Sequence, residues 1–428
     1  MRREVVITGL GAVSPIGNDV ETIWNSVREG KNGIAKITRY DVTGRKVTLA
    51  GELKDFDPEA IIGKREVKKM DRYSQYAMCA AVEAFRDAGI KDVEELLAEA
   101  GGEDGFDSSK ATWEERSRWG VLMASGIGGI RTIEEEQEKG MEKGFDRVSP
   151  FFIPKSISNM AAGHIAIRYG LHGSCTCVVT ACASGGNAIG DAFRQIRDGY
   201  ADLMLAGGAE AAITPLSIGG FTTLKALTQA DDPNRASIPF DKERSGFVMG
   251  EGAGALVLEE LEHAKKRGAK IYGKITGYGS NCDAYHMTAP DPTGTGAAEC
   301  MKLALSDAGI TPETVDYINA HGTSTPLNDS GETKAVRTAF GAHADELKVS
   351  STKSMTGHLL GASAALEAVI TVKAMEQDFL PPTIGYQVPD EACDLDIVPN
   401  KGYAYPINCA ISNSLGFGGH NVTLVFQK

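Results

Sequence analysis

Apolar residues along the chain form short continuous runs that alternate with amphipathic stretches. The runs end in glycine or other small residues, as buried strands do. The stretches between them repeat apolar residues at helical spacing. This alternation predicts an α/β fold with a mostly parallel sheet covered by helices. The predicted strands are Val5–Leu10, Trp119–Ala124, Cys175–Ala181 and Leu203–Ala206, and the predicted helices are Tyr73–Ala88, Ile157–Tyr169 and Gly185–Arg197.

Two segments lack this alternation. Residues 91–118 are acidic, contain glycine and show little periodicity, so we expect a surface excursion there. Residues 131–150 include the charge run Glu134-Glu-Glu-Gln-Glu-Lys139, which is typical of a solvated helix face.

A weak internal repeat divides the chain. Ala84-Phe-Arg-Asp-Ala-Gly-Ile90 recurs as Ala304-Leu-Ser-Asp-Ala-Gly-Ile310, and each copy ends a helix with glycine upstream of an apolar strand. Gly246–Leu258 likewise matches Gly416–Phe426. Two matches in the same order predict a duplicated α/β unit, with halves at residues 1–269 and 270–428. A charged helix rather than a loose linker joins them, so we expect the halves to pack as one body.

Composition and charge narrow the class of protein. The 428 residues carry a formal net charge of −13, which argues against a general nucleic-acid or membrane-surface binder. No apolar run approaches the roughly 20 residues that cross a bilayer. The 50 glycines indicate many tight turns and close backbone contacts. Eight cysteines in a large chain without an export signal predict reduced thiols and a cytoplasmic protein.

Two glycine-rich stretches resemble nucleotide-binding loops only superficially. Gly9-Leu-Gly11-Ala-Val-Ser14 has serine in place of the third glycine of a dinucleotide fingerprint, and no acidic residue follows at the required distance. Gly250-Glu-Gly-Ala-Gly254 lacks the Lys-Ser/Thr of a phosphate loop. We expect tight structural turns at both places.

Cys182 is the strongest candidate for a nucleophile. Val178-Val-Thr-Ala-Cys182-Ala-Ser-Gly-Gly186 runs from an apolar strand through a turn of small residues into a helix. Free N–H groups and the dipole at a helix N-terminus favour a thiolate, and small neighbours allow a strained elbow. The alternative is a buried, inert cysteine. Cys175 and Cys177 alternate along the predicted strand, one toward the core and one toward its covering helices, and a metal site with His172 lacks a second paired ligand set.

Two histidines each follow a predicted strand. His321 lies in Asn319-Ala-His-Gly-Thr-Ser-Thr-Pro326, and His358 lies in Ser350-Ser-Thr-Lys-Ser-Met-Thr-Gly-His358 before a helix of small residues. Functional groups in α/β sheets gather beyond the carboxyl ends of strands. A histidine in such a loop suits acid–base or oxyanion-stabilising chemistry.

These motifs together resemble the β-ketoacyl-[acyl-carrier-protein] synthases, most closely type II of the dissociated bacterial system. The resemblance covers essentially the whole chain and implies a thiolase-like fold with two βαβαβαββ halves in five αβαβα layers, forming a homodimer. The motifs that carry it are Val179-Thr-Ala-Cys182-Ala-Ser-Gly, Asn319-Ala-His321-Gly-Thr-Ser-Thr-Pro, Ser351-Thr-Lys353-Ser-Met-Thr-Gly-His358-Leu-Leu-Gly-Ala and Asn413-Ser-Leu-Gly-Phe417-Gly-Gly-His-Asn.

The resemblance implies an acyltransferase that elongates fatty acids by two carbons. Cys182 would take the acyl chain from an acyl carrier protein, and His321 and His358 would support decarboxylation of malonyl carrier protein and stabilise the enolate. The phosphopantetheine arm arrives on the carrier protein, so no bound cofactor or metal is expected. The remaining implied assignments are an oxyanion hole from the N–H groups of Cys182 and Phe417, a gate at Phe417, an ion pair between Lys353 and Glu367, and arm-binding hydroxyls at Thr323 and Thr325.

One departure and several relatives qualify this interpretation. Leu415 stands where a second phenylalanine is expected before the gate, which affects the acyl pocket or gate mobility rather than the reaction.

A thiolase would need a second catalytic cysteine in the C-terminal loop, and a type III synthase would use Cys-His-Asn. A non-catalytic chain-length factor would lack Cys182. A catalytic subunit of a polyketide or polyene pathway remains an alternative.

Carrier proteins are acidic, so an acidic enzyme needs a local basic surface to bind them. The segment Lys64-Arg65-Glu-Val-Lys68-Lys69 places four cations within six residues. The resemblance places this segment and Lys225 near the mouth of the pantetheine tunnel. The alternative for the segment is an ordinary solvated helix end.

Overall fold

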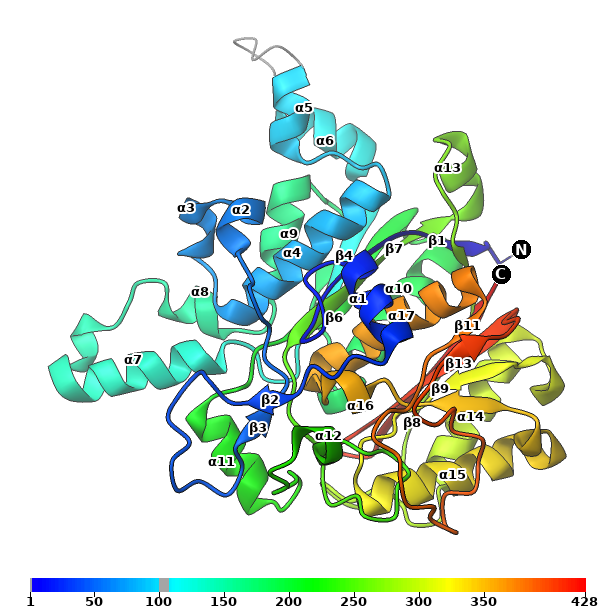
Figure 1. Cartoon of the computed structure of the whole chain (residues 1–428). Helices are drawn as coiled ribbons and strands as arrows, with labels where there is room; N and C mark the ends of the chain where they lie inside the picture. The colour runs from blue at the N-terminus through cyan, green and yellow to red at the C-terminus, as the bar shows by residue number, and fades with distance from the viewer. Residues whose placement is uncertain (1, 100–107) are drawn as a thin grey trace.

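The computed structural model describes residues 2–99 and 108–428 (Figure 1). Ten strands form one sheet with the order β10-β9-β13-β14-β8-β1-β7-β6-β4-β5. The two halves of this sheet meet at β1 and β8. The strands are β1 (Val5–Val13), β4 (Trp119–Ala124), β5 (Cys175–Thr176), β6 (Leu203–Glu210), β7 (Gly252–Glu260), β8 (Gly273–Cys282), β9 (Tyr317–Asn319), β10 (Lys348–Ser350), β13 (Cys409–Gly416) and β14 (His420–Gln427).

The helices complete five layers. Two helices lie between the halves of the sheet, because α10 packs on β6, β4 and β14 while α17 packs on β7 and β13. One pair covers the outer face of the first half, and another pair covers that of the second (Figure 1). The central helices are α10 (Ser184–Arg197) and α17 (Ser363–Gln377), and the outer pairs are α4 (Arg72–Asp87) with α9 (Met160–Tyr169) and α14 (Thr295–Ala308) with α15 (Pro326–Phe340).

The two halves share one topology. Outward from the junction, the first half runs β1-β7-β6-β4-β5 and the second runs β8-β14-β13-β9-β10, so strands correspond in chain order. The repeated sequences end α4 and α14, the equivalent outer helices. The duplicated unit expected from the repeat is therefore present, and we propose a division of the chain into residues 1–269 and 270–428.

Glycines in β1 allow a close helix contact rather than a tight turn. A Cβ on Gly9 would lie 2.2 Å from the Ala84 carbonyl oxygen, and one on Gly11 would lie 1.9 Å from that of Ala80. The prediction of a turn at Gly9–Ser14 was wrong, because α4 packs backbone to backbone on the strand. Gly277 and Gly279 in β8 meet α14 in the same way. Gly252 and Gly254 similarly lie in β7 rather than in a turn.

Side chains of α4 also close the open edge of β1. Beyond Ile7, β1 parts from β8, and the N–H groups of Leu10 and Ala12 donate to Asp87 and Glu83. Glu83 also accepts from the N–H of Val20 at 2.7 Å. Burial raises the pKa of Glu83 to about 7.

The sheet differs from the prediction in two respects. It is mixed rather than mostly parallel, because β7 and β14 run antiparallel to both of their neighbours. The strand predicted at Cys175–Ala181 is only Cys175–Thr176, an exposed edge. Cys175 is exposed and Cys177 is partly exposed. The prediction that one of them enters the core was therefore wrong. The chain leaves the edge early to enter the turn that carries Cys182.

The predicted helices are confirmed with small shifts. The helix predicted at Ile157–Tyr169 begins at Met160, after the separate short helix α8. Part of the predicted excursion at 91–118 forms two helices, and residues 100–107 lie outside the described residues. The remaining elements are α1 (Val20–Glu29), β2 (Ala35–Lys36), β3 (Leu49–Ala50), α2 (Pro58–Ile62), α3 (Lys64–Val67), α5 (Val93–Glu99), α6 (Ser108–Arg116), α7 (Ile130–Lys143), α8 (Phe152–Ser156), α11 (Pro215–Thr223), α12 (Pro233–Ala236), α13 (Leu261–Lys266), α16 (Lys353–Thr356), β11 (Phe379–Leu380) and β12 (Tyr403–Ala404).

Candidate active site

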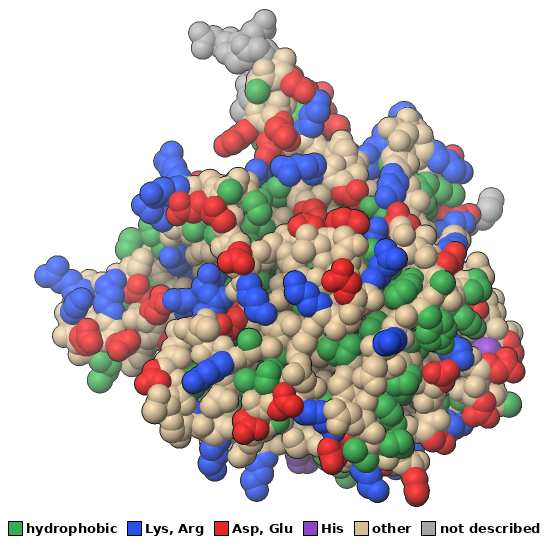
Figure 2. Space-filling view, viewed as in Figure 1, with side chains coloured by type: hydrophobic (Ala, Val, Ile, Leu, Met, Phe, Trp, Pro, Cys, Tyr) green, Lys and Arg blue, Asp and Glu red, His purple; other side chains and the backbone are tan. Residues whose placement is uncertain are grey.

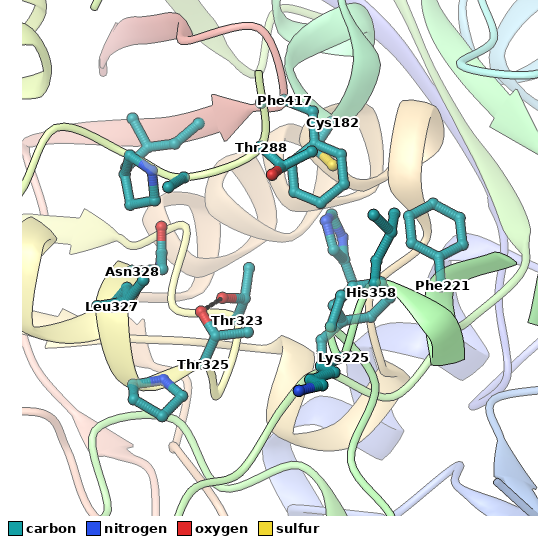
Figure 3. Close-up of a pocket in the computed structure, with 18 of the residues that line it drawn as sticks. Cys182, Phe221, Lys225, Thr288, Thr323, Thr325, Leu327, Asn328, His358 and Phe417 are labelled. Atoms are coloured by element: carbon teal, nitrogen blue, oxygen red, sulfur yellow. Dashed lines mark hydrogen bonds between the residues drawn. The ribbon is translucent and has the colours of Figure 1, made fainter. Parts of the chain in front are cut away.

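A cavity of about 420 Å³ is lined by residues from both halves of the fold (Figure 3). The first half contributes Cys182 and Lys225, and the second contributes His358 and Phe417. The lining is mainly apolar, with a few polar groups, as in sites that bind a largely apolar ligand. Thr323 and Thr325 lie across the cavity from Cys182 in Figure 3, and their hydroxyls are 2.9 Å apart.

Cys182 occupies a strained turn at the start of α10. The turn spans Ala181–Ala183 and leads directly into Ser184, and Ala181 has a φ of 50°, which is unfavourable for a residue with a Cβ. The sulfur accepts a backbone hydrogen bond from Phe417. Burial nevertheless raises the pKa of the thiol to about 12, which Lys353 only partly offsets. The expected thiolate is therefore not the resting form, because the loss of hydration outweighs the stabilising groups.

Backbone segments pack tightly around this turn. A Cβ on Gly416 would lie 2.8 Å from the Thr180 carbonyl oxygen and 3.2 Å from the Cys182 nitrogen. A Cβ on Gly185 would lie 3.1 Å from the carbonyl oxygen of Gly361. Glycine at these positions lets the Phe417 N–H approach the sulfur. Gly416, which precedes Phe417, thus lies directly against the backbone nitrogen of Cys182.

His358 lines the cavity, and His321 packs edge to face against it. The ring centroids of His321 and His358 are 5.3 Å apart, and both residues are buried. Burial lowers both pKa values well below the usual 6.5, with a further contribution from the charge of Lys353. The rings are therefore neutral at pH 7. His358 Nδ1 is 2.8 Å from the Ser363 hydroxyl, which can donate to it and leave the proton on Nε2.

Lys353 and Glu367 form an ion pair behind the histidines. Lys353 is 1% exposed and Glu367 is 2% exposed. Burial raises the pKa of Glu367 to about 7, although Lys353 lowers it. The cation lies close enough to influence Cys182 and both rings, while remaining outside the residues that line the cavity.

Two buried glutamates support the site and were missed in the sequence. Glu332 accepts hydrogen bonds of 2.8 Å from the N–H groups of both His321 and Gly322. Glu210 accepts from main-chain N–H groups of two separate loops next to Cys182. The sequence contains a feature that could have identified each of these glutamates. Glu210 ends an otherwise apolar strand, and Glu332 lies eleven residues after His321 on the adjoining helix.

The gate candidate and its neighbour lie at the cavity wall. The ring of Phe417 is beside Phe221, with centroids 6.2 Å apart. Leu415, the departure from the expected phenylalanine, lines the same cavity and packs against the core of the second half. A leucine here occupies less volume next to the gate than phenylalanine does.

The predicted basic surface is only partly at this cavity. Lys225 lines it, with a φ of 57° and an exposed side chain. The cavity lining does not include Lys64, Arg65, Lys68 or Lys69; α3 packs on α2, which in turn packs on α4. Val67 and Met70, which flank Lys68 and Lys69 in the sequence, line a separate hollow together with Arg131 and Lys155. Figure 2 shows Lys and Arg side chains gathered with acidic neighbours over α3.

The cysteines and other possible metal ligands are scattered through the described part of the fold. Within residues 2–99 and 108–428, no three His, Cys, Asp or Glu side chains are grouped as a metal site would require. All eight cysteines are free thiols, as expected. In the same ranges, no helix is both long enough and apolar enough to cross a membrane.

Comparisons with known proteins identify the family of the chain. The family model for the Beta-ketoacyl synthase, N-terminal domain, matches residues 2–264, and that for the Beta-ketoacyl synthase, C-terminal domain, matches residues 272–387. The 3-oxoacyl-[acyl-carrier-protein] synthase 2 of Synechocystis sp. is 52% identical over 428 residues, covering 100% of this chain and 98% of its own. The protein of the same name from Staphylococcus aureus is 51% identical over 426 residues, with the same coverage.

Solved structures show the same fold. A ketosynthase from a type II PKS acyl-carrier protein complex, bound to the hexaketide, has a TM-score of 0.87 at 38% identity and covers 100% of this chain and 99% of its own. The ishigamide ketosynthase/chain length factor has a TM-score of 0.88 at 35% identity with 100% coverage of both chains. The fold is thus the thiolase-like ketosynthase fold, and this chain belongs to the β-ketoacyl synthase family.

Proposed function

We propose that the protein is an acyltransferase that condenses an acyl chain with malonyl-acyl carrier protein. The product is a 3-oxoacyl-acyl carrier protein that is longer by two carbons, as in fatty acid elongation. One observation carries this proposal: a thiol that receives the Phe417 N–H shares a cavity with a neutral histidine, and a second neutral histidine lies directly behind it. The full-length relatives named 3-oxoacyl-[acyl-carrier-protein] synthase 2 support the same reaction.

The first half-reaction is acyl transfer to Cys182. Its sulfur attacks the thioester carbonyl, and the carbonyl oxygen becomes an oxyanion held by the N–H groups of Cys182 and Phe417. The bond to the pantetheine sulfur then breaks. Because the thiol pKa is about 12, its proton leaves during the attack and is taken up by the departing pantetheine thiolate.

The second half-reaction forms the new carbon–carbon bond. Malonyl carrier protein loses CO₂, and the bonding electrons form an enolate whose oxygen accepts hydrogen bonds from the Nε2–H groups of His321 and His358. The enolate carbon attacks the Cys182 thioester, and the Cys182 thiolate leaves and takes a proton from solvent. Neutral rings suit this role because they donate without protonating the carbanion.

The substrate arm and its carrier have separate binding regions in this proposal. Thr323 and Thr325 offer hydroxyls to the phosphopantetheine arm, and the arm itself belongs to the carrier, so no resident cofactor is needed. Phe417 gates access of the second substrate. Lys225 at the cavity, together with Lys64, Arg65, Lys68 and Lys69 on and after α3, forms the basic surface for an acidic carrier protein.

We also propose that the protein is a homodimer in the cytoplasm. Strand β5 is an exposed edge, which native proteins normally cover. Exposed apolar side chains accompany it, including Ile167 of α9, which packs on β5, and Val179, which follows β5 in the chain. A second copy pairing across β5 would cover both features. The eight free thiols suit a reducing compartment.

The acylation of Cys182 is the test of this function. Purified protein is mixed with a series of acyl carrier proteins, and its intact mass is recorded. We expect a gain of one acyl group per chain, abolished in Cys182→Ala, and the preferred chain length is read from the same series. Full acylation of Cys182→Ala would exclude this nucleophile.

A specialised polyketide or polyene pathway is the second candidate. The similarity to the ketosynthase of the type II PKS complex and to the ishigamide ketosynthase/chain length factor supports it. The presence of Cys182 beside His358 argues against a non-catalytic chain-length-factor role. Repeated condensation on one chain without intervening reduction would favour the polyketide candidate. A single two-carbon extension per cycle would favour fatty acid elongation.

A further inference from the structure

Glu210 is a buried carboxylate that the proposed reaction does not use. It ends β6 and is 0% exposed. One oxygen accepts from the N–H groups of Gly126 at 2.8 Å and Gly361 at 3.0 Å. The other accepts from the Ser125 hydroxyl at 3.0 Å and the Ile127 N–H at 3.2 Å. All four partners are donors, so both oxygens must act as acceptors.

These donors come from both halves of the fold. Ser125, Gly126 and Ile127 follow β4 of the first half, whereas Gly361 lies three residues after His358 in the second. The loops are in direct contact, since a Cβ on Gly361 would lie 2.3 Å from the Gly126 nitrogen. Glu210 therefore joins the first half to the loop that carries one of the two histidines.

The same loops press on the turn that carries Cys182. The carbonyl oxygen of Gly361 faces Gly185 in the first turn of α10, where a Cβ would lie 3.1 Å from it. A Cβ on Gly126 would lie 3.7 Å from the Ala181 carbonyl oxygen. Ile127 and Cys182 also pack against one apolar cluster. Movement of either loop would therefore shift the sulfur relative to His358.

We propose that Glu210 is a positioning residue that fixes the Cys182 turn relative to the His358 loop through four hydrogen bonds, three from the Ser125–Ile127 loop of its own half and one from Gly361 of the other half. This inference rests on the proposed condensing activity. It predicts that loss of the carboxylate slows turnover without weakening substrate binding, because the binding groups at Thr323 and Thr325 lie elsewhere in the cavity.

Glu210→Gln tests this role because the amide nitrogen must face N–H donors and cannot accept from them. We expect kcat to fall at least about tenfold, because a misplacement on the order of 1 Å costs up to about a hundredfold. KM for acyl carrier protein should change by less than about twofold. Single-turnover acylation of Cys182, followed by intact mass, should slow in parallel with kcat.

Glu83→Gln is the matched control. Glu83 is another buried glutamate with a pKa raised to about 7, and it likewise binds main-chain N–H groups, but on α4 away from the cavity. Both variants should lose thermal stability, and only Glu210→Gln should lose most of its kcat. A kcat loss in Glu210→Gln no greater than that in Glu83→Gln would overturn the proposal.

Ser125→Ala decides the question if Glu210→Gln does not fold. It removes one donor to Glu210 and keeps the carboxylate and the three main-chain donors. We expect a kcat reduced by about two- to fivefold with unchanged KM, and an unchanged kcat would overturn the proposal. Failure of the wild-type protein to acylate Cys182 at all would instead reject the proposed function.

Discussion

The buried ion pair between Lys353 and Glu367 gives a prediction that separates stability from chemistry. Both side chains are almost fully buried, so replacing one leaves an uncompensated polar or charged group in the interior. Breaking such a pair costs about 3–5 kcal/mol. Replacing both with apolar residues of similar volume is often close to neutral. We therefore expect Lys353→Met and Glu367→Leu each to be strongly destabilising and the double variant to recover most of the loss.

The expected change in melting temperature follows from chain length. Unfolding entropy of roughly 2.1 cal/mol/K per residue over 428 residues gives about 0.9 kcal/mol/K. A loss of about 4 kcal/mol then lowers the midpoint by about 4–5 °C in each single variant. Scanning calorimetry of the three variants and the wild type, at one protein concentration, completes a double-mutant cycle. The double variant should melt within about 2 °C of wild type.

The chemistry should not recover with stability. Burial is the main cause of the low pKa values of His321 and His358, and the charge of Lys353 lowers them further, so loss of the lysine lets those values rise toward 6.5 even in the double variant. Activity should stay low in Lys353→Met/Glu367→Leu despite a restored midpoint. Additive destabilisation in the double variant would refute the pairing argument, and restored activity would refute the electrostatic role of the lysine.

Three further predictions address pH, carrier binding and assembly. His321 and His358 have pKa values well below 6.5, so their rings should stay neutral in the folded protein as the pH falls through 6.5, whereas the same residues in an unfolded chain take up protons. NMR titration of the imidazole carbons checks this. A titration midpoint near 6.5 for either ring would contradict it. The double variant Lys68→Glu/Lys69→Glu should raise KM several-fold for carrier-bound substrates and leave KM for pantetheine mimics unchanged, because only the carrier protein would contact these lysines. Equal effects on both kinds of substrate would show that this segment does not bind the carrier protein. Ile167→Glu, at a side chain that is 76% exposed in the single chain, should shift the protein from dimer to monomer in sedimentation velocity, whereas an unchanged dimer would place the interface elsewhere.

The sequence alone determined the features that depend on local pattern. The repeat of 84–90 at 304–310 revealed the duplication, because the same helix end and following strand are built in each half. Small residues around Cys182 predicted a turn into a helix, since only a short, unhindered segment can make that bend. The loops of His321 and His358 were likewise identified from their position after short apolar strands.

Only the tertiary structure decided properties that depend on neighbours distant in the chain. Strand direction was misjudged because an apolar run reads the same in a parallel and an antiparallel strand, and only the pairing of β7 and β14 with their neighbours decides it. Gly9 and Gly11 were assigned to a turn, since a local pattern cannot show that α4 would lie on them. A local pattern likewise could not show that Lys225 lines the cavity whereas Lys64, Arg65, Lys68 and Lys69 do not.

The electrostatics of the site also required the folded structure. A helix N-terminus predicted a thiolate at Cys182, yet burial raises the pKa of that thiol to about 12. Glu210 and Glu332 gain their roles only when loops from separate parts of the chain aim N–H groups at their carboxylates. Local sequence determines which residues can do chemistry, whereas desolvation and long-range hydrogen bonds, which arise only on packing, determine their charge and position.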